Sequence, residues 1–433
     1  MIVELPCRYE GYLNNSILHL KIGVSTELFF YLAGLFFYMK LIEVTDKKTR
    51  QAFYQVAKEL YCKDPNWVCP LDVEIEDVFN PVQNSLFKDG EAIRWVLRND
   101  GGKLIGRIAA FYSKAKASKN DQPTGGIGFF ECINDRQAAF LLFDQCKKWL
   151  QERGMEAMDG PITFGENITY WGLLIEGFAM PAYGMPYNFP YYRELFEAYG
   201  FKTYFEQFSY EADLSKPFPE RQVKFAMHVK EKFQLEHFTF VNKEKYMNDI
   251  CTIYNKVWAD FHEDYTPLDY TEIAKIFKKA KTILNEELIW FVYDNGIPAA
   301  MVIVFPDVNQ ILRKLGNGKL TPWNILKFFW YKNTGTITRA RQLLTAVTPE
   351  YQRSGVTGAL FLTMVDALIR NKIRVLDMSW VGDYNITVNK IYRLLGLPVV
   401  KKHLTLRYMF DPEREVVRFT NMETKKSKRL SGE

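Results

Sequence analysis

The stretch Val347-Thr-Pro-Glu-Tyr-Gln352-Arg353-Ser354-Gly355-Val356-Thr357-Gly358-Ala-Leu360 decides the fold of this chain. It predicts a strand that runs into a glycine-containing turn, which then opens a helix. Such a turn presents consecutive backbone N–H groups and the positive end of the helix dipole to an anion. The stretch therefore predicts a binding loop for an anion such as pyrophosphate.

A second stretch, Asn385-Ile-Thr-Val-Asn-Lys-Ile-Tyr392-Arg-Leu-Leu-Gly396, lies downstream of the first. It follows the strand-like Val375-Leu-Asp-Met-Ser-Trp380 and predicts a helix that ends at Gly396. Asn385 stands seven residues before Tyr392, and Tyr392 stands four before Gly396. The order of strand, glycine loop, helix, strand, Asn, Tyr and Gly is far more specific than either stretch alone.

Together the two stretches resemble the GNAT superfamily of acyl-CoA N-acyltransferases, in which a Gln/Arg-x-x-Gly-x-Gly/Ala loop cradles the pyrophosphate of coenzyme A. The resemblance implies a cofactor site made by Val347, Gln352, Arg353, Ser354, Gly355, Val356, Thr357 and Gly358. It also implies that Tyr392 protonates the leaving thiolate and that Asn385 positions the cofactor or a water. One position departs from the family pattern, because Thr357 stands where the second Gly or Ala is usual.

The chain also contains an internal repeat of domain size. Trp95-Val-Leu-Arg-Asn-Asp-Gly-Gly-Lys-Leu-Ile-Gly-Arg-Ile-Ala-Ala-Phe111 matches Trp290-Phe-Val-Tyr-Asp-Asn-Gly-Ile-Pro-Ala-Ala-Met-Val-Ile-Val-Phe305, and both predict a hairpin. Phe196-Glu-Ala-Tyr-Gly200 parallels Tyr392-Arg-Leu-Leu-Gly396 at nearly the same offset. A repeat of this size indicates duplication of a domain.

The predicted fold is therefore α/β (α+β), with two tandem acyl-CoA N-acyltransferase-like domains, each a mixed central sheet flanked by helices. The predicted divisions are a doubtful leader at 1–38, a degenerate N-terminal domain at 39–213, a C-terminal domain with the cofactor site at 214–412, and a basic tail at 413–433. A chain of 433 residues is also too long for one typical core.

The two halves differ in chemistry. Where the C-terminal half has its glycine loop, the N-terminal half has Phe129-Phe-Glu-Cys-Ile-Asn-Asp-Arg-Gln, with no glycine to let a phosphate approach the backbone. Phe196 replaces the tyrosine and has no proton to give. We expect that the N-terminal domain has lost the cofactor site, and that it either shapes the acceptor pocket or only braces the active half.

Composition excludes several classes of protein. Apolar residues make up 48% of the chain and charged residues 25%, as in ordinary globular proteins. A net charge of +5 without an arginine-rich stripe gives no reason to expect nucleic acid. The six cysteines and five histidines have no metal-ligand spacing, so we predict no metal and a reducing, cytoplasmic location.

The N-terminal residues contain the apolar run Leu28-Phe-Phe-Tyr-Leu-Ala-Gly-Leu-Phe-Phe-Tyr-Met39, which is too short for a stable membrane span. We expect translation to begin at Met39, where the first strand of the fold begins. The alternative is that the leader anchors the protein at a membrane surface.

Three further segments are candidates for the ligand-binding region. The Pro-punctuated loop at 64–71 is expected at a ligand-facing edge, and the loop at 160–167 is expected to form a cleft wall with Trp171-Gly172. The insertion at 306–341 contains an amphipathic helix over Trp323-Asn-Ile-Leu-Lys-Phe-Phe-Trp330-Tyr331. This helix either lines an apolar channel or packs on the body of the protein.

These patterns favour an N-acyltransferase, and an N-acetyltransferase first among these, that uses acetyl-CoA or a longer acyl-CoA. A small primary amine attacks the thioester directly. The general base is unassigned, with Glu350, Glu263 and a water chain as candidates. The alternative is a non-catalytic acyl-CoA or ligand-binding protein of the same fold. Transfer from aminoacyl-tRNA is a third hypothesis, which the lack of a basic face disfavours.

Overall fold

The computed structural model describes residues 39–118, 122–166, 168–259 and 267–420. The N-terminal leader, Glu263 and most of the basic tail, for which the sequence made predictions, lie outside these residues. In the described part of the chain, no helix combines the length and the apolar character needed to cross a membrane.

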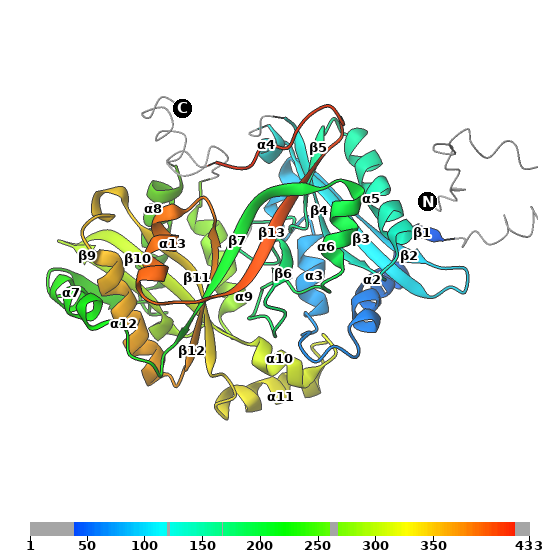
Figure 1. Ribbon diagram of the computed structural model, residues 1–433. Coiled ribbons are helices and arrows are strands. Elements are labelled where there is room, and N and C mark those ends of the chain that lie inside the picture. Colours follow the sequence, from blue (N-terminus) through cyan, green and yellow to red (C-terminus); the bar gives the residue numbers. More distant parts are fainter. Residues whose placement is uncertain (1–38, 119–121, 167, 260–266, 421–433) are drawn as a thin grey trace, which may run out of the picture.

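The N-terminal half builds one end of a single large sheet (Figure 1). Its elements are β1 (Lys40–Glu43), α2 (Lys47–Leu60), α3 (Asp72–Val78), β2 (Gly90–Arg98), β3 (Leu104–Ser113), α4 (Lys114–Ala117), β4 (Thr124–Cys132), α5 (Arg136–Gln151), β5 (Ala157–Gly160), β6 (Leu173–Glu176), α6 (Tyr192–Tyr199) and β7 (Lys202–Asp213), with a 3₁₀ turn at Ser85–Lys88.

The C-terminal half repeats the plan. Its elements are α7 (Glu220–Lys230), β8 (Gln234–His237), α8 (Lys243–Ala259), α9 (Tyr270–Ala280), β9 (Ile289–Asp294), β10 (Ile297–Pro306), α10 (Asn309–Leu315), α11 (Pro322–Asn333), β11 (Arg339–Val347), α12 (Val356–Arg370), β12 (Val375–Gly382), α13 (Ile386–Leu394) and β13 (Val399–Met409), with 3₁₀ turns at Glu286–Leu288 and Pro349–Tyr351. Both predicted hairpins are present, as β2–β3 and β9–β10.

Helices cover both faces of the sheet, as the mixed α/β prediction requires. In the N-terminal half, α5 and α6 bury one apolar cluster that includes Phe143 and Phe196, and α2 buries another around Phe53. In the C-terminal half, α12 and α13 cover one face of the sheet, and α8 and α9 cover the other. These stripes bury apolar side chains on both sides of the strands, which makes each half a three-layer structure.

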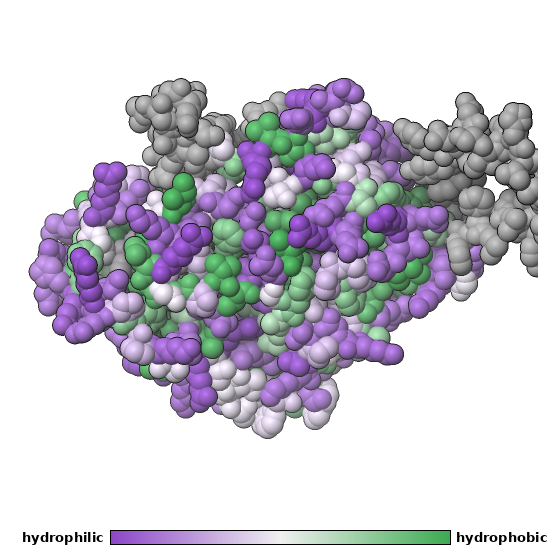
Figure 2. Space-filling view, viewed as in Figure 1, coloured by the Kyte–Doolittle hydropathy of each residue, from purple (hydrophilic) through white to green (hydrophobic). Residues whose placement is uncertain are grey.

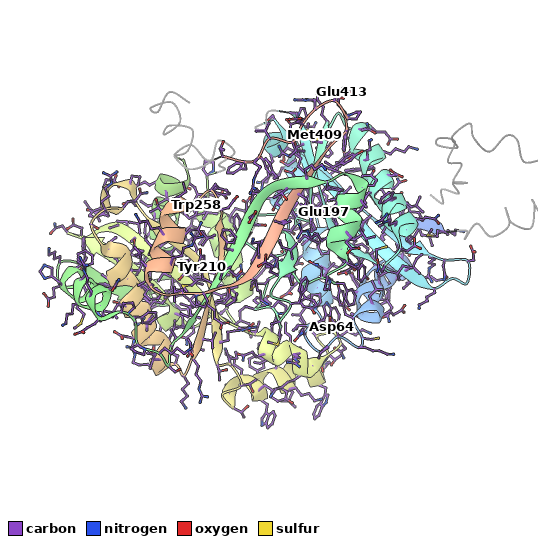
Figure 3. The ribbon with its side chains drawn as sticks, viewed as in Figure 1. Asp64, Glu197, Tyr210, Trp258, Met409 and Glu413 are labelled. Atoms are coloured by element: carbon purple, nitrogen blue, oxygen red, sulfur yellow. The ribbon has the colours of Figure 1, made fainter. Side chains whose placement is uncertain are left out.

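The last strands of the two halves are exchanged, which the sequence did not indicate. The strand order is β1-β2-β3-β4-β5-β13-β7-β12-β11-β10-β9-β8, so β13 pairs with β5 of the N-terminal half and β7 pairs with β12 of the C-terminal half. Figure 3 shows the exchange, with Tyr210 of β7 among the C-terminal elements and Met409 of β13 beside the N-terminal ones. The predicted division at 213/214 separates the halves along the chain, but the sheet runs through it.

Each half contains a pair of parallel strands that part from one another. In the N-terminal half β4 pairs with β5 only from Thr124 to Gly126, and in the C-terminal half β11 pairs with β12 only from Arg339 to Gln342. Beyond these residues β4 continues to Cys132 without pairing with β5, and β11 continues to Val347 without pairing with β12. The result is a V-shaped opening in each half, and the two openings differ in what surrounds them.

Candidate functional site

The loop predicted to bind pyrophosphate lies at the C-terminal opening, between β11 and α12. Gln352, Arg353 and Ser354 are exposed, and Gly355 is the N-cap of α12 with φ +82°, a conformation that glycine adopts without strain. No side chain caps α12 at Gly355. The Ser354 hydroxyl lies 3.3 Å from the N–H of Val356. The N–H of Val356 thus donates to this hydroxyl, and the N–H of Gly358 donates to the carbonyl of Gly355 at 3.0 Å. Among the described residues the N–H of Thr357 has no acceptor, and it lies in the first turn beside the exposed Arg353.

The equivalent turn in the N-terminal half already holds a negative charge. Asp135 is the N-cap of α5, and its carboxylate accepts a hydrogen bond of 2.8 Å from the N–H of Ala138. A carboxylate at this position stabilises the helix dipole and repels a phosphate. The difference between Asp135 and Gly355 supports the prediction that the N-terminal half has no pyrophosphate site.

Gly355 has a second role in packing, whereas Gly358 has room for a side-chain carbon. A Cβ on Gly355 would lie 2.7 Å from the ring of Phe225, and one on Gly358 would lie 3.5 Å from Ala226. Both contacts come from α7, which lies along α12. Glycine at 355 is therefore required by the backbone and by the neighbouring helix, whatever the loop binds.

Val347 ends β11, and its carbonyl lies 3.5 Å from the side-chain nitrogen of Gln352. From 343 to 347, the β11 edge that faces the opening has no pairing with β12. Free backbone groups on such an edge can pair with an extended ligand, as a further strand does. Val347, which the resemblance assigns to the cofactor site, ends this edge.

Tyr392 lies on α13 and is buried against the same opening. Its hydroxyl accepts a hydrogen bond of 2.9 Å from the side chain of Gln342, the last residue of β11 that pairs with β12. Burial raises the pKa of Tyr392 to about 12. The phenol therefore stays protonated at neutral pH and can donate a hydrogen bond.

Asn385 has a structural role that the sequence pattern did not specify. It is the N-cap of α13, and its side-chain oxygen accepts a hydrogen bond of 3.2 Å from the N–H of Val388.

Glu350 is exposed and lies 3.7 Å from Lys256. Backbone and Thr348 hydrogen bonds lower the pKa of Glu350, which makes it a weaker base.

The N-terminal opening contains a cavity of ≈ 120 Å³. Its walls come from the loop at 67–70, the end of β4, the segments 161–163 and 184–188, and α10. The loop at 64–71 and the wall at 160–172 were predicted to face a ligand, and both line this cavity. The sequence did not predict that α10 would close its far side.

Charged and phenolic groups line the cavity. Glu131 of β4 accepts a hydrogen bond of 2.8 Å from the hydroxyl of Tyr192 and lies 3.4 Å from the guanidinium of Arg107. Burial raises the pKa of the Glu131 carboxyl, although the charge of Arg107 opposes the shift. A carboxylate in such surroundings is a candidate partner for an ammonium group and a candidate base.

Directly behind the cavity wall lies a layer of buried polar side chains on the strands β7, β11, β12 and β13. A Cβ on Gly172 would lie 2.4 Å from the side chain of Gln207, and one on Gly184 would lie 2.9 Å from Arg341. Both glycines line the cavity. The layer consists of Gln207, Ser209, Arg341, Asp377, Ser379, Lys401 and His403, which we call the polar floor.

Part of the polar floor is tightly paired. Arg341 donates to the hydroxyl of Ser379 at 2.9 Å and to the carbonyls of Tyr183 and Ile168. Lys401 donates to the carbonyls of Gly177 and Ala179 at 2.7 Å each. Burial lowers the pKa of Lys401 to about 8, and these two carbonyls can accept from the neutral amine as well as from the cation.

Other groups of the polar floor lack partners. One carboxylate oxygen of Asp377, the hydroxyl of Ser209 and the side-chain nitrogen of Gln207 have no hydrogen-bond partner among the described residues. Burial, together with the charges of Lys401 and Arg341, lowers the pKa of His403 to about 3, so its ring is neutral. Buried polar groups without partners are unusual and often mark a place where a ligand or water binds.

The sequence analysis missed the polar floor and Glu131, although both had a weak signal. Asp377 interrupts the apolar strand Val-Leu-Asp-Met, and Glu131 follows two phenylalanines. A charged residue inside an apolar strand is costly unless it is paired or functional. The sequence of a single strand does not show which charged residues of other strands will lie beside it.

No protein-family model matches the chain. Among curated proteins, the chain is 26% identical over 395 residues to Protein YghO of Escherichia coli (strain K12), covering 88% of this chain and 98% of that protein. It is 28% identical over 371 residues to a protein named bacterial ceramide synthase from Caulobacter vibrioides (strain NA1000 / CB15N), covering 83% and 94%.

Two solved structures share the fold. A tandem GNAT protein from the clavulanic acid biosynthesis pathway gives a TM-score of 0.52 at 11% identity and covers 87% of this chain and all of that one. A GCN5-related glucosamine N-acetyltransferase region of a fungal multi-domain β-N-acetylglucosaminidase gives 0.53 at 11% identity, with 86% of this chain and 38% of that one covered. At these identities the likeness concerns the fold.

Proposed function

We propose that this chain, which has the tandem fold of the GCN5-related N-acetyltransferases, moves an acyl group from acyl-CoA to a primary amine. The observation that carries the proposal is the N-terminus of α12, where the N–H of Thr357 has no acceptor among the described residues, beside the edge of β11 that does not pair with β12. The helix N-terminus is a site for the pyrophosphate of coenzyme A, and the adjacent strand edge can pair with the extended pantetheine arm. Tyr392 lies at the same opening, beside the position of the thioester.

The acceptor amine occupies the cavity of the N-terminal half. Gly172 and Gly184 line this cavity on the side of the polar floor, whose Arg341 and Asp377 lie on β11 and β12, so the amine approaches the C-terminal opening from this side. Glu131 pairs with the ammonium group of the acceptor and takes its proton, directly or through water. Of the two roles that the sequence left open for the N-terminal half, the cavity favours shaping the acceptor site.

The acyl group is long, and the acceptor is a long-chain amino alcohol. This part of the proposal rests on the relative named a ceramide synthase, since a ceramide is an N-acylated long-chain amino alcohol. The cavity of ≈ 120 Å³ has room for the amino end of such an acceptor only, and Trp67, Phe129 and Leu312 add apolar surface there beside the charged pair. A long-chain donor is therefore preferred over acetyl-CoA.

The reaction needs no covalent enzyme intermediate. The neutral amine attacks the thioester carbonyl, the C–N bond forms, and the C–S bond breaks to release coenzyme A. Glu131 has by then taken one proton from the ammonium group, and the nitrogen loses its second proton to solvent as the C–N bond forms. The thiolate is stabilised by the hydroxyl of Tyr392 and takes up a proton from solvent. The hydrogen bonds of Glu131 with Tyr192 and of Tyr392 with Gln342 support these two roles.

The test is transfer measured as free thiol, with acetyl-CoA and long-chain acyl-CoAs against sphingoid bases and short amines. Glu131→Gln should lower kcat/KM by roughly 10²-fold or more, as expected for loss of a general base. Glu91→Gln is the matched control, because Glu91 also accepts from a tyrosine, at 3.0 Å from Tyr112, and pairs with Arg153 at 2.9 Å, yet it does not line the cavity.

Equal activity of the two variants would refute the assignment of Glu131 and leave the transferase proposal standing. If the protein binds acyl-CoA but releases no free thiol with any of the amines, the alternative of a non-catalytic acyl-CoA-binding protein would be favoured. Equal use of acetyl-CoA and long-chain donors would refute the proposed chain length alone.

A further inference from the structure

Helix α11 exposes its apolar side to solvent. Trp323, Leu326 and Trp330 are 63%, 60% and 61% exposed, and they recur at spacings of three and four, so they share one face of the helix. Phe329, Ile325 and Leu320 extend the same exposed surface. We call this surface the α11 face; a contiguous apolar patch of this kind marks an interaction site.

The inward side of α11 carries Phe328, which packs against the apolar cluster of Val68, Val308 and Leu312, and a buried polar side chain. Asn324 is buried, and its side-chain nitrogen donates to the side chain of Asn317 at 2.9 Å and to the carbonyl of Lys319 at 2.8 Å. The hydroxyl of Thr321 caps the helix by accepting from the N–H of Asn324 at 3.2 Å. These bonds fix the rotation of α11 about its axis, so Trp323, Leu326 and Trp330 point outward.

The segment that contains α11 carries only positive charge. No Asp or Glu occurs between Asp307 and Glu350, whereas residues 308–338 contain five basic side chains: Arg313, Lys314, Lys319, Lys327 and Lys332. The ammonium group of Lys327 lies 5.5 Å from the ring of Trp323, and that of Lys314 lies 4.6 Å from the ring of Tyr331. Aromatic and basic side chains thus alternate over the same small surface.

This combination fits the surface of an anionic lipid bilayer. Tryptophan prefers the interface between headgroups and acyl chains, and each lysine near an anionic membrane adds attraction. A second copy of this chain fits less well, because a two-fold contact through the α11 face would bring like charges together. The absence of acidic residues in the segment is therefore what selects lipid over self-association.

The α11 face is connected to the proposed acceptor site. Asn309 and Leu312 of α10 line the cavity, and α10 packs against α11 at the bottom of the view in Figure 1. Figure 2 shows pale and purple side chains together on that part of the molecule. Docking through α11 would bring the α10 wall of the cavity close to the membrane.

We propose that α11 docks this protein on anionic membranes as an interfacial helix, with Trp323, Leu326 and Trp330 inserted among the lipids. The proposal goes beyond the proposed transfer reaction, and its test needs neither acyl-CoA nor acceptor. Failure of lipid binding would therefore leave the reaction untouched, and failure of the reaction would leave lipid binding untouched.

The test is flotation of the full chain with vesicles of phosphatidylcholine and phosphatidylglycerol, and with vesicles of phosphatidylcholine alone. The parent should bind the anionic vesicles and release them at high salt. Leu326→Ser and Trp330→Ser should each weaken binding roughly tenfold, since each removes a large inserted apolar group. Leu394→Ser on α13 is the matched control, because Leu394 is 59% exposed and lies away from α11.

Lys327→Glu should weaken binding to anionic vesicles by several-fold and leave thermal unfolding unchanged. Three results would overturn the proposal: no binding of the parent to anionic vesicles, equal binding of the Leu326, Trp330 and Leu394 variants, or equal binding to both kinds of vesicle. A dimer that forms in solution without lipid and dissociates in Trp330→Ser would assign the α11 face to a second copy of the chain.

Discussion

Replacement of Tyr392 by phenylalanine separates a role in transfer from a role in packing. The substitution removes one hydroxyl and leaves the ring, which packs edge-on against the ring of Tyr210 at 5.1 Å. It also removes the acceptor of the hydrogen bond from Gln342, which is itself buried. The variant therefore changes stability and catalysis by two separate routes, each with its own magnitude.

The stability loss follows from the orphaned amide of Gln342. A buried polar group that loses its partner costs about 1–3 kcal/mol, so the free energy of unfolding should fall by that amount. Tyr210→Phe is the matched control, because the hydroxyl of Tyr210 donates to the side chain of Asn389 at 2.7 Å in the same cluster. The loss of this hydroxyl leaves the buried side-chain oxygen of Asn389 without its donor, and the free energy of unfolding should fall by a similar amount.

The catalytic loss follows from the raised pKa. A phenol with a pKa of about 12 is roughly 3.5 units above an ordinary thiol, so complete proton transfer to the leaving thiolate is uphill by about 5 kcal/mol. Tyr392 should therefore act as a hydrogen-bond donor to the developing thiolate. Removal of one such donor costs roughly 10²–10³-fold in kcat.

The assay compares kcat, the dissociation constant for acyl-CoA and denaturant unfolding for the parent, Tyr392→Phe and Tyr210→Phe. We expect both variants to lose similar stability and to retain cofactor binding, with kcat reduced only in Tyr392→Phe. Turnover of Tyr392→Phe within about twofold of Tyr210→Phe would show that Tyr392 only packs, and that another group stabilises the thiolate.

Calorimetry should find one coenzyme A site per chain, and two equivalent sites would contradict the difference between Gly355 and Asp135. Thr357→Glu should weaken coenzyme A binding roughly tenfold or more while keeping or raising stability, because an acidic residue favours a helix N-terminus but repels a phosphate; Thr357→Gln is the neutral control, and equal affinities would place the cofactor elsewhere. His403→Gln should reduce the loss of stability in acid, since the unfolded chain protonates this histidine below a pH of about 6.5, whereas the folded protein resists until a pH of about 3. Between these values the free energy of unfolding of the parent should fall with decreasing pH by up to about 1.4 kcal/mol per unit more than that of the variant, and His228→Gln, at an exposed position, should behave as the parent does.

The amino-acid sequence determined the local elements of both halves, because each depends on neighbouring residues. The two hairpins follow from apolar strands around Asn, Asp and Gly turns, and the helix after Gly355 follows from a strand, a glycine and an apolar run. The tandem architecture could also be predicted, since the two halves contain matching stretches of sequence at 95–111 and 290–305. Both cleft-lining loops, at 64–71 and 160–167, were identified from their proline and glycine content.

Only the tertiary structure decided which strands complete each half of the sheet and which polar residues come together in the polar floor. β7 and β13 cross between the halves, and a strand carries no local signal that says whether its partner lies in its own half or in the other. The polar floor depends on that crossing, because His403 and Lys401 reach Arg341 and Asp377 only when β13 and β7 lie beside β12. The outward rotation of α11 was equally hidden, since the helical pattern gives an apolar stripe but not the direction in which it faces. That direction was set by the hydrogen bonds of Asn324, which pair the helix with residues outside it.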